Sequence, residues 1–160
     1  MRITKYNLAL HCEERVPCLV KEDSKNYPQF SQISDALRAV QLVNTIFGAN
    51  LQPEEHCYMV AFRSKRVVGV FELGHGTINT TIITPKEVFT RLLLSSATHF
   101  IFFHNHPSGD TTPSEADVEI TKQLKEAGKM MGLLILDHII IGEHDWDYYS
   151  FQERSKLLEY

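Results

Sequence analysis

One polar stretch in the second half of the chain determines how the rest is read: His104-Asn105-His106-Pro107-Ser108-Gly109-Asp110-Thr111-Thr112-Pro113-Ser114-Glu115-Ala116-Asp117. The apolar run 100–103 comes directly before it and is typical of a strand buried on both faces. Side chains two apart at the end of a strand point the same way, so we expect His104 and His106 to face one point. Pro107 and Pro113 break the strand, and Asp117, one turn into the next helix, can aim back at that point.

Two imidazoles and one carboxylate with a vacant fourth position are the ligand set of a catalytic zinc. Zinc at such a site lowers the pKa of water toward about 7. A second interpretation treats Ser114-x-x-Asp117 as a helix N-terminus, with serine as the N-cap and an acidic residue in the first turn. That interpretation leaves His104 and His106 without a partner, and Ser114 can do both jobs.

Hydrophobic periodicity predicts the elements around this stretch. We expect helices at 34–47, 86–95 and 114–131; Ser34 is the expected N-cap of the first, and Gly48 and Gly132 are expected to end the first and third. Leu92, Leu93 and Leu94 are expected to face inward. Strands are predicted at 57–62, 67–73, 77–83, 100–103, 133–141 and 148–151, with a turn at 63–66. This order predicts an α/β (α+β) fold, in which helices cover both faces of a mixed, largely antiparallel sheet.

The length of 160 residues favours a single domain with modest appendages. We divide the chain into an N-terminal arm or hairpin at 1–32 and the main domain at 33–160, and we expect a loop at 22–32.

Composition indicates which partners and which cellular compartment the protein is expected to have. A net charge of −4 has the wrong sign for a protein whose main partner is a phosphate backbone, so nucleic acid is disfavoured, although a local basic patch stays open. The odd count of three cysteines cannot complete a set of disulfides, which favours a reducing compartment. No apolar run approaches the roughly 18 residues of a membrane span. We therefore expect a cytoplasmic protein with no membrane partner.

The sequence also resembles a known family. His104-x-His106, seven residues, then Ser114-x-x-Asp117 is similar to the JAMM motif of JAB/MPN metalloproteins. The RadC branch is resembled more closely, through 104–110, Pro113-Ser114, Thr121, 136–142 and 149–151. Full-length RadC proteins resemble this sequence only in their C-terminal half.

The resemblance implies a JAB/MPN (cytidine deaminase-like) fold and a zinc-dependent hydrolase of peptide or isopeptide bonds, with a peptide or protein as substrate. It implies that His104, His106 and Asp117 hold Zn²⁺ and that Ser114 donates to the oxyanion. An upstream glutamate would act as general base; Glu55 is the match, and its neighbour Glu54 stays open as the alternative.

Two other functions stay open: a nucleic-acid-associated DNA repair module, suggested only by the name RadC, and a non-catalytic MPN scaffold. Four further residues near the motif are expected to have structural roles. Cys57 is expected to be a buried, inert thiol on the face of Glu55, and Asp110 a turn residue. Asp137 and His138 are expected to satisfy each other's hydrogen bonds.

Overall fold

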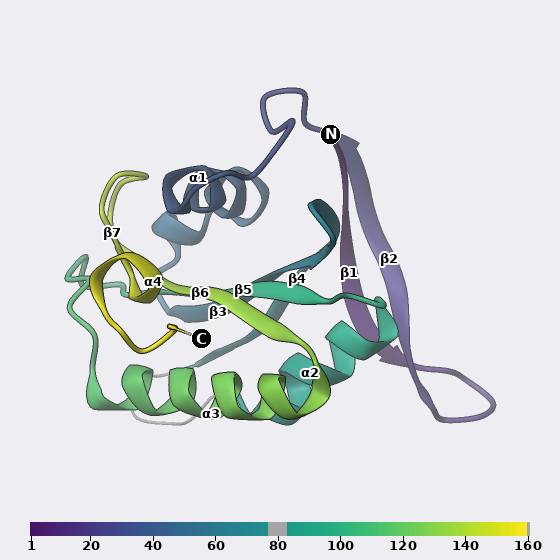
Figure 1. Ribbon diagram of the computed structural model, residues 1–160. Helices are drawn as coiled ribbons and strands as arrows, with labels where there is room; N and C mark the ends of the chain where they lie inside the picture. The colour runs from purple at the N-terminus through teal and green to yellow at the C-terminus, as the bar shows by residue number, and fades with distance from the viewer. Residues whose placement is uncertain (77–82, 160) are drawn as a thin grey trace.

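A sheet of seven strands forms the centre of the molecule (Figure 1). The computed structural model describes residues 1–76 and 83–159, and in these ranges the strand order is β2-β1-β4-β3-β5-β6-β7. The strands are β1 Arg2–Leu10, β2 Pro17–Asn26, β3 Glu55–Arg63, β4 Arg66–Gly76, β5 His99–Asn105, β6 Leu134–Ile141 and β7 Tyr148–Ser150. The pairs β1/β4 and β5/β6 are parallel and the other neighbours are antiparallel. The predicted mixed, largely antiparallel α/β sheet is confirmed.

Helices cover both faces of this sheet, as predicted. They are α1 Ala36–Phe47, the short 3₁₀ helix η1 Ala49–Leu51, α2 Pro85–Leu94, α3 Glu115–Met131 and α4 Phe151–Arg154. Helix α1 lies on one face, and α2 and α3 lie on the other (Figure 1). Each face has its own apolar cluster: Val40 of α1 packs with Tyr58 and Phe103, whereas Leu124 of α3 packs with Met59 and Phe102. Strand β5 therefore contributes side chains to both clusters.

The ends of α1 follow local rules, with one change from the prediction. Its N-cap is Asp35 rather than Ser34: the Asp35 carboxylate accepts from the backbone N–H of Arg38 at 2.8 Å, and the Ser34 hydroxyl donates to that carboxylate. A carboxylate carries a full charge toward the positive helix end, so it is the better cap here. The predicted end at Gly48 is confirmed, since Gly48 adopts the left-handed conformation at φ 62° that favours glycine.

Four other expectations need comment. Leu92 is buried, but Leu93 and Leu94 are 60% and 44% exposed, because three consecutive helical residues cannot all face one side. The expected loop at 22–32 is wrong over its first part, since β2 continues to Asn26 through its pairing with β1. Phe151 begins α4 rather than ending the last strand. The strand predicted at 77–83 lies, except for its last position, outside the described residues.

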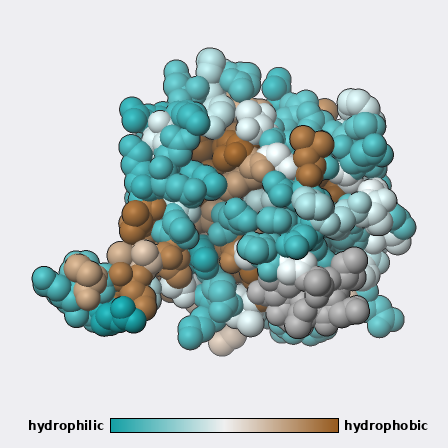
Figure 2. All heavy atoms as spheres, turned by 180° about the vertical axis from the view of Figure 1, so that it is seen from behind, coloured by the Kyte–Doolittle hydropathy of each residue, from teal (hydrophilic) through white to brown (hydrophobic). Residues whose placement is uncertain are grey.

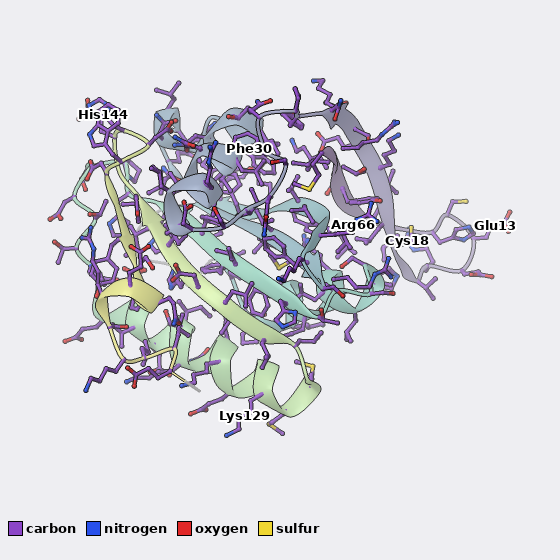
Figure 3. All side chains as sticks on the ribbon, turned by 45° about the horizontal axis from the view of Figure 1, so that its top comes forward. Glu13, Cys18, Phe30, Arg66, Lys129 and His144 are labelled. Atoms are coloured by element: carbon purple, nitrogen blue, oxygen red, sulfur yellow. The ribbon has the colours of Figure 1, made fainter. Side chains whose placement is uncertain are left out.

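The β1–β2 pair extends the sheet at one edge, where Lys5 of β1 pairs with Val70 of β4. Its far end projects from the body, and Figure 3 places Glu13 and Cys18 there, on the opposite side of the molecule from His144. Apolar side chains gather along this projection (Figure 2), among them the half-exposed Leu10 and Val16. Within the described ranges, no helix is long and apolar enough to cross a bilayer.

Candidate metal centre

The two motif histidines stand at the C-terminal end of β5, the strand between β3 and β6. His104 is 2% exposed and lies opposite Cys57 of β3 and Ile140 of β6. The chain stays attached to the sheet one residue past β5, because the backbone N–H of His106 donates to the Ile141 carbonyl at 3.0 Å. The strand therefore fixes both histidines before the loop begins.

Helix α3 brings the third predicted ligand to the same point. Asp117 Oδ1 lies 3.0 Å from His104 Nε2, and Asp117 Oδ2 lies 3.6 Å from His106 Nε2. The two histidine Nε2 atoms are 3.0 Å apart. Ligands bound at 2.0–2.1 Å to a tetrahedral zinc stand about 3.3 Å from one another. The spacing of these three side chains thus suits one tetrahedral ion of zinc's size.

Hydrogen bonding fixes which nitrogen of His106 carries a proton. Its Nδ1 lies 2.6 Å from the backbone carbonyl of Asp110, and a carbonyl can only accept. Nδ1 therefore holds the proton and donates, and in the neutral ring Nε2 is left with a bare lone pair. That lone pair faces His104 and Asp117.

A longer chain of hydrogen bonds fixes His104 in the same way. Thr121 donates its hydroxyl to the Asp117 carbonyl at 2.5 Å, so toward His138 Nδ1, 2.6 Å away, it can only accept. Burial holds the pKa of His138 well below its usual value, so this ring has one proton, on Nδ1. His138 Nε2 then accepts from His104 Nδ1–H at 2.8 Å. The Nε2 of His104 is left bare.

Three acceptors consequently converge with no proton required between them, an arrangement that a cation completes. Without the ion, a proton on Nε2 of a histidine takes the place of that cation beside Asp117, and the pKa values describe this metal-free case. Burial opposes ionisation of Asp117, but hydrogen bonds from His104 and His106 outweigh it and hold the pKa far below its usual range. Burial also lowers the pKa of His106, yet hydrogen bonds to Asp117 and the Asp110 carbonyl, with the charges of Asp117 and Glu55, raise it overall. The residues at this point fit a divalent metal.

Ser114 holds the carboxylate of Asp117 in place. Its backbone N–H and its hydroxyl each donate to Asp117 Oδ2 at 2.7 Å, and its Oγ accepts from the Asp117 backbone N–H at 3.2 Å. This reciprocal pattern is a capping box at the start of α3. The helix-cap interpretation of Ser114 is therefore confirmed, and the hydroxyl proton points at a candidate ligand.

Glu55 and Glu54 lie on different sides of β3. The carboxylate of Glu54 lies 3.5 Å from Nδ1 of His75. Glu55, in contrast, shares its strand face with Cys57, and its charge acts on both Cys57 and His106. Of the two candidate bases, Glu55 is thus the one that shares a sheet face with Cys57 and with His104, the partner of Cys57 across β3 and β5.

Asn105 holds the start of β3 against the end of β5. Its buried side chain accepts from the backbone N–H of His56 at 2.8 Å and donates to the Glu54 carbonyl at 3.0 Å. A further contact runs to the Gln52 carbonyl at 3.4 Å. These bonds surround Glu55 in sequence, so one amide sets where its carboxylate can stand relative to the histidines.

Two residues near the centre, Cys57 and Asp110, have structural roles. Cys57 is buried, and burial followed by the charges of Glu55 and Asp117 raises the pKa of its thiol, so it stays neutral. The Asp110 carboxylate accepts from Thr112 N–H within the loop, and only its backbone carbonyl contacts His106.

The expected pairing of the Asp137 and His138 side chains is wrong, because alternation in β6 turns these neighbours to opposite sides. Asp137 accepts from Ser150 and from the Gln152 backbone N–H. His138 contacts His104 and Thr121 instead.

Sequence reasoning missed His138, Thr121 and Asn105 as parts of the site. All three lie in segments that carried the RadC resemblance, which marked the positions but gave them no role. Phe151, in the last of these segments, stacks on the His138 ring at 4.8 Å between centroids and 9° between planes. The segments that carry the RadC resemblance, which lie far apart in the sequence, thus come together around His138, the hydrogen-bond partner of His104.

The fold and site together define a JAB/MPN-type domain with a candidate metal centre at the end of its central strand. Residues 33–157 match the RadC-like JAB domain, and the chain belongs to this family.

Bacterial relatives carry names that state no activity. A UPF0758 protein of Pelobacter propionicus is 48% identical over 92 residues, which cover 58% of this chain and 39% of the relative. A UPF0758 protein of Caldanaerobacter subterraneus is 42% identical over 106 residues, covering 62% and 46%. One from Chlorobium chlorochromatii is 43% identical over 107 residues, covering 66% and 47%. The chain spans less than half the length of these relatives.

Proposed function

We propose that this chain is a zinc-dependent hydrolase of amide bonds, a peptidase or isopeptidase, with His104, His106 and Asp117 as the metal ligands. The observation that carries the proposal is the convergence of two bare imidazole nitrogens and a carboxylate within 3.0 to 3.6 Å. Only three protein donors converge there among the described residues, so a fourth position is left for water or substrate. An open position is what separates a catalytic site from a structural one.

Zinc at an open site polarises water and a scissile carbonyl and makes hydroxide available near neutral pH. Glu55, on the same face, takes the proton that water loses and delivers it to the leaving amine. Ser114 donates its hydroxyl to the developing oxyanion. To do so, the hydroxyl turns away from Asp117 Oδ2, which keeps its bond from the Ser114 backbone N–H.

The substrate in this proposal is a peptide or protein, and the compartment is the cytoplasm. Cys12, Cys18 and Cys57 are all free thiols, which suits a reducing environment.

Elemental analysis of the purified chain, followed by assays on a peptide library, tests the proposal. We expect zinc at the centre, its loss in His106→Ala, and cleavage that stops when a chelator removes the metal. His99→Ala is the matched control, since His99 lies on the same strand at its opposite end. Purified protein that takes up no transition metal would end the proposal, and so would cleavage that survives in His106→Ala.

A further inference from the structure

A second group of metal-ligating side chains lies on the other side of β3. Glu54, His56 and His75 each present one donor atom, and the three atoms lie within 4.8 Å of one another. His56 and His75 are direct cross-strand partners in the β3/β4 pair. His56 stacks on Tyr58, which belongs to the apolar cluster under α1, so this group faces away from His104 and Asp117.

An irregularity in the sheet assembles this group. The β3/β4 register shifts between Cys57 and Tyr58, so that Cys57 pairs with Gly74 while Tyr58 pairs with Glu72. Leu73 is the extra residue on β4, and its side chain joins the cluster on the opposite face. The shift brings Glu72 and His75 to one face although they are three apart, and bulges commonly re-aim side chains in this way.

Glu72 prepares His56 for a ligand. Its Oε1 lies 2.8 Å from His56 Nδ1, and a carboxylate accepts that proton, which leaves the Nε2 lone pair of a neutral ring bare. Metal-ligating histidines are commonly held by such a second carboxylate. The His56 side chain is only 14% exposed and is fixed by this bond.

We propose that Glu54, His56 and His75 bind a second divalent transition metal, with Glu72 orienting His56. Imidazole suits zinc, copper and nickel. The rings of His56 and His75 now stack 5.0 Å apart, so His75 must turn its ring until a nitrogen faces the ion. Its side chain is 61% exposed and that of Glu54 is 59% exposed, so both side chains can turn toward the ion without any change in the apolar core. The bound ion would tie the ends of β3 and β4 together behind Glu55.

Titration calorimetry with Zn²⁺ on the full chain tests this proposal independently of the function proposed above. The His104→Ala variant removes the central site, and we expect it still to bind one Zn²⁺. Adding His75→Ala should abolish that binding, and Glu72→Gln should weaken it about tenfold or more. His11→Ala, which removes an exposed histidine in the β1–β2 turn, is the control and should change nothing.

The result that overturns the proposal is equally specific. A His104→Ala protein that is folded by circular dichroism but binds no Zn²⁺ would refute a second site. Binding that persists unchanged in His104→Ala/His75→Ala would assign the ion elsewhere. Absence of peptidase activity bears on neither outcome, because the measurement counts ions and not turnover.

Discussion

At the scale of single residues, two adjacent glutamates serve different sides of one strand. Because Glu55 lies on the sheet face of His104 and is the base in the proposed function, we predict that Glu55→Gln folds and binds metal but lowers kcat about a hundredfold or more. Glu54→Gln is the matched control: introduced into a His75→Ala chain, which already lacks the second metal site, it should leave kcat near the value of that chain. Kinetics on a cleaved peptide, with metal content measured in parallel, check this pair. A larger loss of kcat in Glu54→Gln would reverse the assignment.

His138 is fully buried, yet it sets the proton position on His104 through their hydrogen bond. We predict that His138→Phe lowers zinc affinity about 10- to 100-fold. His138→Gln should keep most of that affinity, because its Oε1 can accept from His104 Nδ1–H while its amide donates to Thr121. Competition with a zinc chelator measures affinity, and ¹⁵N chemical shifts of the His104 ring report its tautomer. Equal zinc affinity in both variants would show that His138 only fills space and does not set the proton position on His104.

Local spacing was enough to predict that His104, His106 and Asp117 meet, because strand alternation and helix capping act over a few residues. It could not reveal His138, which is 34 positions from its partner His104 and reaches it only when β6 pairs with β5. Likewise, spacing alone did not show that Glu54 approaches His75 whereas Glu55 shares a sheet face with Cys57; both depend on the pairing of β3 with β4.

At the scale of elements, Asn105 joins the start of β3, where Glu55 lies, to the end of β5, beside His104 and His106. We predict that Asn105→Ala destabilises the fold by about 1–3 kcal/mol, since it leaves buried backbone groups of His56 and Glu54 without partners. It should also lower kcat more than it raises KM, because Glu55 loses its fixed position. Urea unfolding and kinetics test both parts.

The control for this variant is Asn50→Ala, whose amide donates to the Glu143 carbonyl at the surface. Its effect on stability should stay within about 0.5 kcal/mol. Comparable losses of stability in the two variants would contradict the role of Asn105 in holding the start of β3 against the end of β5.

Across the whole molecule, Asp137 ties the central sheet to the C-terminal segment and makes stability depend on pH. Burial, opposed by hydrogen bonds from Ser150 and Gln152, raises its pKa from 3.8 to about 6. A carboxyl with a raised folded-state pKa stabilises fully below about pH 3.8, and this contribution is lost as the pH rises through about 6. The loss amounts to about 3 kcal/mol by neutral pH.

Asp137→Asn removes this titration and keeps the shape of the side chain. We predict that the wild type loses stability relative to the variant between about pH 4 and 7, as measured by urea unfolding of the metal-free proteins. Groups such as His106 and Asp117 are common to both and cancel in the difference. Parallel curves would show that folding does not raise the pKa of Asp137.

The fold as a whole was predictable because periodicity identified most elements and their order. What failed was decided by pairing: β2 runs to Asn26 because β1 supplies its hydrogen bonds, and β4 extends past its predicted end beside β3. Exposure of Leu93 and Leu94 likewise depended on which side of α2 meets the sheet.

Strand β5 has a hydrogen-bonded neighbour at each edge and apolar side chains packed on each face. We therefore expect the polypeptide to fold before it binds an ion, unlike small zinc domains, which are folded only when their metal is bound. Metal binding is then a separate step that follows folding. Under the zinc-dependent function proposed above, a cell short of zinc would then hold a folded but inactive pool of this protein, which gains activity when zinc becomes available.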